Sequence, residues 1–86
     1  MSKPMNIHLI KGAFSTADAL DLITQMIHIK IKYHEDRIDQ NSHEEDTKYR
    51  ESKIKQLQKE LFQLRAGIGP EMKGLKLDAT INITAQ

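Results

Sequence analysis

The clearest pattern along the chain is an alternation of apolar and polar residues near its end. From Leu75 to Thr84 every second residue is apolar, and the residues between them are polar or charged. A period of two is typical of a β-strand with one buried face and one solvated face. The pattern therefore predicts a strand over about 75–84. A shorter apolar run predicts another strand over about 6–11, which Gly12 is expected to end.

The middle of the chain has the periodicity of two helices. Ser15 can cap free backbone N–H groups, and Asp18 follows three residues later, as in a reciprocal capping box. No Gly or Pro interrupts the next stretch, so we expect a helix over about 16–39.

The second helix has its own start and stop signals. Ser42 is the expected cap, followed by an acidic first turn, and the pattern predicts a helix over about 43–66. Gly67 is a candidate left-handed C-cap, and Gly69-Pro70 prevents further helix.

The first helix carries two apolar seams. One seam, repeating every three or four residues, consists of Leu20, Ile23, Ile27, Ile31, His34 and Ile38. The second, displaced by very roughly 140° around the axis, includes the candidate interface Leu22, Met26, Ile29 and Tyr33. The second helix has one narrow stripe, formed by Ile54, Leu57, Leu61, Leu64 and Ile68. That stripe can cover only one of the two seams.

The element order predicts a single domain over residues 1–86 of the α+β class. A short break between two long helices favours an antiparallel hairpin, flanked by short N- and C-terminal strands in the order β-α-α-β. An isolated two-stranded ribbon is marginal in water, so we expect uncovered apolar surface to mark an interface. The simplest solution is a two-fold homodimer that forms a helical bundle. A monomer whose strands fold over the second seam is the alternative.

Composition limits the class of protein and the cellular compartment that we expect. The 86 residues are 38% hydrophobic and 29% charged with a formal net charge of +1, a balance typical of a globular protein without a strong electrostatic field. The absence of Cys excludes disulfides and thiolate chemistry and fits a reducing compartment. No apolar run is long enough for a signal peptide or a membrane span. We expect a cytoplasmic protein with no membrane association.

Candidate chemistry is sparse. His34 lies on the first seam near the hairpin tip, where Lys48 or Tyr49 is expected opposite, and a histidine there is usually a packed, hydrogen-bonded polar group. The acidic residues at the tip lack the convergent ligand spacing of a metal site. We therefore predict no enzyme activity, and no catalytic, cofactor-binding or metal residues. A small enzyme with an intersubunit pocket near His34 is an alternative.

A basic edge on the second helix is the candidate surface for nucleic acid, with Lys48, Lys55 and Lys59 as its members. Acidic residues interleave with these lysines, and no recognition helix is evident, which makes nucleic acid an unlikely partner. A nucleic-acid- or ribosome-associated factor is thus an alternative function.

The N-terminal part of the chain resembles the opening of small uncharacterised bacterial proteins. The resemblance runs from Ile7 through Gly12-Ala13-Phe14-Ser15 into the long first helix. These proteins have a strand, a Gly-x-Phe-Ser/Thr helix start and a helical hairpin. The resemblance covers about the first 40 residues. It implies a bacterial cytoplasmic setting and carries no activity, cofactor or site residue.

The function expected from these patterns is that of a non-enzymatic interaction or structural protein. It would act as a homo-oligomer, or as an adaptor for a protein partner, through the seam of Leu22, Met26, Ile29 and Tyr33. The last strand is available for pairing in trans.

Overall fold

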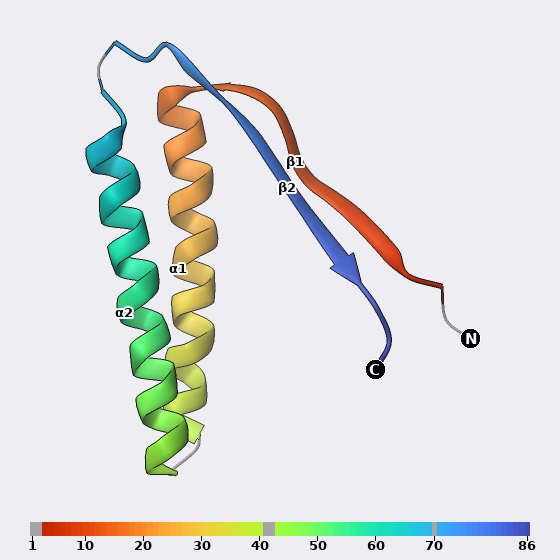
Figure 1. Ribbon diagram of the computed structural model, residues 1–86, viewed down its shortest axis with the longest axis vertical. Coiled ribbons are helices and arrows are strands. Elements are labelled where there is room, and N and C mark those ends of the chain that lie inside the picture. The colour runs from red at the N-terminus through yellow and green to blue at the C-terminus, as the bar shows by residue number, and fades with distance from the viewer. Residues whose placement is uncertain (1–2, 41–42, 70) are drawn as a thin grey trace.

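The chain folds as a helical hairpin with a two-stranded ribbon beside it (Figure 1). The computed structural model describes residues 3–40, 43–69 and 71–86, with the side chain of residue 40 left out. The elements are β1 (Met5–Ser15), α1 (Thr16–Gln40), α2 (Glu44–Gly67) and β2 (Gly74–Ile83). The predicted β-α-α-β order and helical hairpin are therefore confirmed.

The ribbon joins β1 and β2 as antiparallel neighbours over their whole length. The prediction that Gly12 ends the first strand was wrong, because β1 continues to Ser15 and runs directly into α1. Gly12 instead adopts a φ of 143°, a backbone conformation that glycine tolerates without a side-chain clash. A turn-like residue thus lies within a continuous strand.

A β-bulge sets which side chains of β1 share a face. His8 pairs with Thr80 and Ile10 with Ala79, which leaves Leu9 as the extra residue between them. An extra residue reverses the alternation of the strand. Met5 and Ile7, before the bulge, therefore lie on the same face as Ile10 after it. One face of the ribbon is apolar along its full length, and its members are Met5, Ile7, Ile10, Phe14, Leu75, Leu77, Ala79, Ile81 and Ile83.

The start of α1 follows the predicted capping chemistry. The backbone N–H of Asp18 donates to Ser15 Oγ over 3.1 Å, which satisfies one of the free donors of the first turn. The Thr16 hydroxyl donates to the carbonyl of Met72 over 2.8 Å. This second bond ties the start of α1 to the segment before β2 and places both strands at the same end of the helix.

The two helices pack antiparallel along the first seam of α1. Ile31 and His34 of α1 and Leu61 of α2 are buried there, and the other seam and stripe residues with described side chains are half-buried. Arg65 donates to the Thr24 hydroxyl over 3.1 Å near the ribbon end of the pair. Ala19 is fully buried in the first turns of α1, where the ribbon lies closest to the helix.

The ends of α2 differ in detail from the prediction. The expected cap, Ser42, lies outside the described residues, and His43 takes the N-cap position, with the Thr47 N–H donating to its carbonyl over 3.0 Å. Gly67 is not a left-handed cap: it is the last helical residue, and Ile68 ends the helix in an extended conformation. Ile68 is half-buried as the last member of the apolar stripe.

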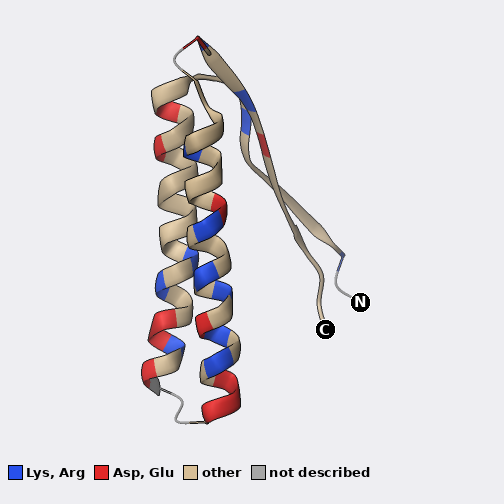
Figure 2. Ribbon diagram, turned by 60° about the vertical axis from the view of Figure 1, so that its left-hand side comes forward, with Lys and Arg blue, Asp and Glu red and all other residues tan. Residues whose placement is uncertain are grey.

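The molecule is open rather than compact. Its principal extents are 46 × 38 × 14 Å and its radius of gyration is 16.2 Å, against about 12 Å for a compact domain of this length. Figures 1 and 2 both show the ribbon leaving α1 at an angle after its base. No helix in the described part of the chain is long and apolar enough to cross a membrane.

Candidate interaction surface

The predicted seam lies very roughly 140° around α1 from the seam that packs on α2, and Figure 1 shows the ribbon on the side of α1 away from α2. Leu22 and Met26, near that base, are half-buried. Ile29 is 70% exposed and Tyr33 is 46% exposed, because the ribbon has diverged from α1 at their level. The structure therefore places the four residues in one row and leaves the lower two in solvent.

The ribbon presents a second apolar surface, of which sequence reasoning identified only the half that belongs to the last strand. Leu75, Leu77 and Ala79 at its base are half-buried, whereas Ile81 and Ile83 farther out are exposed. Met5 and Ile7, their cross-strand partners, are exposed as well. The signal was present in the sequence as a change in the parity of apolar residues in β1 between Ile7 and Ile10, which a bulge resolves.

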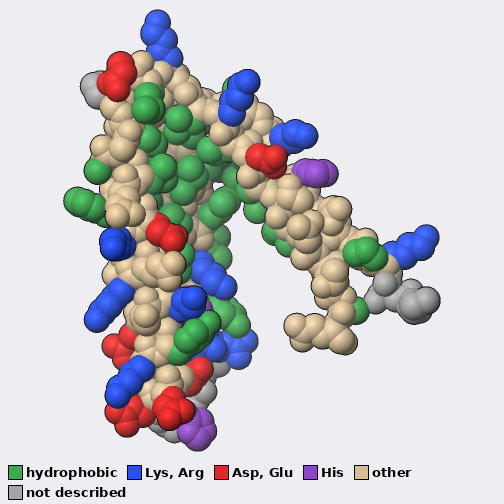
Figure 3. All heavy atoms as spheres, in the orientation of Figure 1, with side chains coloured by type: hydrophobic (Ala, Val, Ile, Leu, Met, Phe, Trp, Pro, Cys, Tyr) green, Lys and Arg blue, Asp and Glu red, His purple; other side chains and the backbone are tan. Residues whose placement is uncertain are grey.

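Space filling makes the relation between these surfaces visible. Figure 3 shows hydrophobic side chains gathered in the angle between the helices and the ribbon, and under the ribbon next to that angle. We call this region the wedge, with the exposed part of α1 as one wall and the outer half of the ribbon as the other.

Cations surround Tyr33 at the edge of the wedge. Lys30 Nζ lies 5.2 Å, Arg37 Cζ 5.1 Å and Arg50 Cζ 5.7 Å from the centroid of its ring. Cation–π attraction of this kind is worth about 0.5–1 kcal/mol at an exposed site. An apolar patch with a charged rim is the usual composition of a protein interface.

His34 is buried beside this cluster and is held from the second helix. Arg50 donates through Nη1 to His34 Nδ1 over 3.1 Å and through Nε to Asp46 Oδ2 over 3.0 Å. Sequence reasoning expected Lys48 or Tyr49 opposite His34 and did not identify Arg50. The Arg50 side chain is in fact only 18% exposed, and it joins the two helices.

The charge state of His34 follows from this geometry. A guanidinium can only donate, so Nδ1 must carry a lone pair and the neutral ring carries its proton on Nε2. Burial lowers the pKa of His34 below 6.5, and the positive charges of Lys30, Arg50 and Lys53 lower it further. The Nδ1 lone pair is already used by Arg50, which makes that atom a poor general base.

The predicted basic surface lies on the outer side of α2. Lys48, Lys55 and Lys59 are exposed, and their spacing of seven and four residues places them on one helix face. Lys48 lies 3.4 Å from a carboxylate oxygen of Glu44, an exposed pair of little energetic weight. Figure 2 shows acidic and basic residues interleaved over the lower half of the hairpin.

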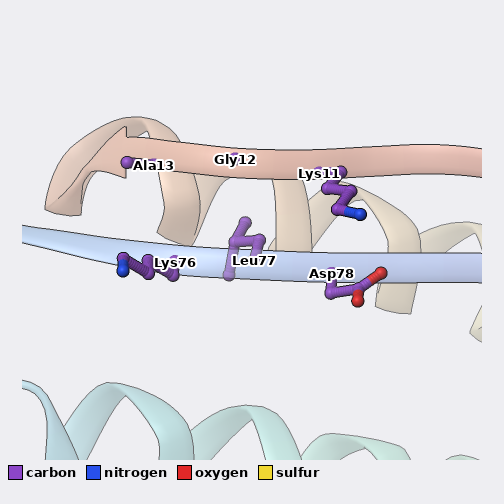
Figure 4. Close-up of a pocket in the computed structure, with 6 residues that line it drawn as sticks. All are labelled: Lys11, Gly12, Ala13, Lys76, Leu77 and Asp78. Carbon is purple, nitrogen blue, oxygen red and sulfur yellow. The ribbon is translucent and has the colours of Figure 1, made fainter.

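Two other features bear on binding. A shallow hollow in the base half of the ribbon is lined by Lys11, Gly12, Ala13, Lys76, Leu77 and Asp78 (Figure 4). Leu77 points toward Gly12 across the strand pair, so the missing side chain of Gly12 leaves the hollow open.

Within residues 3–40, 43–69 and 71–86 no three His, Asp or Glu side chains come close enough together to hold a metal ion.

No protein-family model, curated protein or solved structure matches this chain.

Proposed function

We propose that this chain is a non-enzymatic interaction protein that acts as a homo-oligomer, in its simplest form a two-fold dimer, through the apolar walls of the wedge. The observation that carries the proposal is the size of the surface. The chain exposes 7172 Å², whereas a compact monomer of 9.9 kDa exposes about 5,200 Å². The excess of about 2,000 Å² is more than the roughly 800 Å² per partner that a standard interface buries.

The chemistry of the excess surface supports the same function. Both walls consist of large aliphatic and aromatic side chains, among them Met5 and Ile29, which are at least 60% exposed. Burial of such groups stabilises association by about 25 cal/mol per Å² before the entropic costs of binding. Monomeric proteins rarely expose a contiguous apolar patch larger than a few hundred Å², so large apolar side chains gathered in solvent point to an interface.

The first test is the solution mass by light scattering over a dilution series, at low and high salt. We expect a dimer that dissociates only at high dilution. Ile29→Lys should weaken association about tenfold or more, because it places a charge in the apolar wall. We expect the substitution to leave folding unaffected, because the Ile29 side chain is 70% exposed in the single chain.

Phe62→Lys is the matched control. Phe62 is 72% exposed on α2, where it lines a separate hollow with His28 and Arg65. We expect Phe62→Lys to leave the mass unchanged. A wild-type monomer at every concentration would refute self-association, and the adaptor role with another protein as partner would then be tested by pull-down. A loss of the dimer only in Phe62→Lys would move the interface to α2.

A second candidate function is binding to nucleic acid, which is favoured by the exposure of Lys55 and Lys59 one turn apart on α2. Binding through phosphates falls steeply with salt. A gel-shift with single-stranded RNA and duplex DNA at two salt concentrations tests it. Support requires a salt-dependent shift that a Lys55→Glu/Lys59→Glu double variant weakens, and a shift indifferent to that change would count against this surface.

A further inference from the structure

The outer half of the ribbon has an apolar face without a partner in the described part of its own chain. Met5 lies opposite Ile83 and Ile7 opposite Ile81, so these four side chains share one face, and all are exposed. The same face is half-buried against the helices at the base, at Leu75 and Leu77. The apolar face of the ribbon thus continues past the point where the helices of the same chain cover it.

The other wall of the wedge, on α1, is likewise covered near the base of the ribbon and exposed farther from it. Ile29 and Tyr33 continue the row of Leu22 and Met26, yet they are exposed where those two are half-buried. Figures 1 and 3 show why, since the ribbon and α1 diverge and leave open space between the two walls. An occupant of this space must offer apolar side chains to both walls at once.

A second ribbon does not meet this requirement. One face of the ribbon is apolar, but the other carries pairs such as Asn6 with Asn82 and His8 with Thr80. A ribbon inserted into the wedge would press those polar groups against one apolar wall, with the cost of burying them unpaired. Ile29 and Tyr33 project one turn apart from the curved surface of a helix, which can contact two walls that meet at an angle.

Resting on the proposed self-association, we infer that α1 of a second copy occupies the wedge. By two-fold symmetry the α1 of the first copy occupies the wedge of the second. Ile29 and Tyr33 of each copy then pack against the partner's α1 on one side and under the outer half of the partner's ribbon on the other. The ribbon thereby gains the support that a two-stranded sheet lacks alone.

Charge favours the antiparallel orientation of the two α1 helices. Residues 35–46 contain six acidic residues and one arginine, and Figure 2 shows acids at the hairpin tip. Three of the six, Asp36, Glu44 and Asp46, pair with Lys32, Lys48 and Arg50, so the negative field at the tip is weaker than the count of acids. The ribbon and the segments that precede its two strands carry four lysines, Lys3, Lys11, Lys73 and Lys76, against two acids. An antiparallel arrangement brings the acidic tip of one copy toward the basic ribbon of the other, whereas a parallel one brings like charges together.

The absence of Cys allows a direct test. Two single-cysteine variants, Ile29→Cys and Ile81→Cys, are mixed, equilibrated and oxidised. Every disulfide between positions 29 and 81 is then a bond between chains, and peptide mass spectrometry identifies it. A disulfide needs Cα atoms about 4.4–6.8 Å apart, so rapid formation reports contact of α1 with the ribbon in trans.

A mixture of Phe62→Cys and Ile81→Cys is the control, since Phe62 is as exposed as Ile29 but lies on α2. We expect the 29–81 bond to form at least about tenfold faster than the 62–81 bond. Equal rates in a protein that is dimeric by light scattering would overturn the ribbon contact and leave the proposed function standing. A wild-type protein that is monomeric at all concentrations would overturn both.

Discussion

Arg50 holds a hydrogen-bonded chain between side chains of the two helices. It donates to neutral His34 on α1 and to the carboxylate of Asp46 one turn earlier on its own helix. A buried polar group costs little while it is hydrogen-bonded, and about 1–3 kcal/mol once its partner is lost. The Tyr33 ring lies edge-on to the His34 ring, with 5.6 Å between the ring centroids.

Acid should destabilise the fold through His34. Its pKa in the folded state is below 6.5, so below pH 6.5 the unfolded chain binds more protons at this residue than the folded one. Stability is therefore fully present above pH 6.5 and is lost as the pH falls toward the lowered value. We expect the melting temperature to drop between pH 7.5 and pH 5.5, measured by circular dichroism at fixed protein concentration.

His34→Gln is the matched variant for this prediction. Its amide oxygen can accept the Arg50 N–H, and it does not titrate in this range. The variant should show a flatter melting temperature over the same pH interval. An identical slope in the two proteins would mean that His34 is not the titrating group responsible.

Two glycines with open surroundings should respond to alanine in opposite directions. A Cβ added to either Gly12 or Gly67 would meet no atom within 4 Å, so space does not distinguish them. Gly12 has a φ of 143°, and forcing an L side chain there costs about 1–3 kcal/mol. We expect Gly12→Ala to lower the free energy of unfolding by that amount in urea denaturation.

Gly67→Ala serves as the control because Gly67 is helical. Alanine in a helix is favoured over glycine by up to about 1 kcal/mol, and less at a terminal turn. We therefore expect a gain of a few tenths of a kcal/mol or more. A destabilised Gly67→Ala together with a neutral Gly12→Ala would contradict the backbone account.

At the scale of elements, one extra residue in β1 keeps the apolar side chains of this strand on a single face of the sheet. Apolar residues occupy odd positions at Met5 and Ile7 and an even position at Ile10, so a regular strand would turn part of them outward. The bulge at Leu9 reverses the alternation and keeps all of them on the ribbon's apolar face. Leu9 itself is exposed, as expected of a bulge residue outside the ladder.

The junction of β1 and α1 depends on a single cap. Ser15→Ala removes the acceptor of the Asp18 N–H, which should cost about 1 kcal/mol of stability. Ser52→Ala is the control, because Ser52 is an exposed interior residue of α2 and alanine there should be neutral or slightly stabilising. Urea denaturation of both variants measures the difference, and equal effects would show that the cap contributes nothing.

At the scale of the whole molecule, the open angle between ribbon and hairpin decides the behaviour of the protein. The base of the ribbon is supported by α1, and its outer half has only its own cross-strand bonds among the described residues. Stability should therefore vary along the ribbon, with the outer half opening at lower free energy than the base.

Hydrogen exchange should report association at the outer ribbon. We expect amides of residues 5–8 and 80–83 to exchange faster on dilution, because dissociation uncovers them, while residues 75–77 change little. Mass spectrometry of peptides at two protein concentrations measures both. Exchange at the outer ribbon that is independent of concentration would contradict its burial in an assembly.

The sequence by itself determined the elements and their order. Helix limits, the Ser15 cap, the alternating face of β2 and the two seams of α1 depend on local backbone preference and on periodicity, which are written into neighbouring residues. It failed where a residue has two local meanings: Gly12 is as suited to a bend within a strand as to its end, and Gly67 as suited to a last helical turn as to a left-handed cap.

Only the tertiary structure decided which faces meet. The pairing of His34 with Arg50 depends on the register of two helices, and the exposure of Ile29 and Tyr33 depends on the angle at which the ribbon leaves α1. Both depend on contacts between residues far apart in the chain, so no local pattern specifies them. The sequence required a second apolar seam to be covered, and the structure showed that this chain covers only the upper part of it.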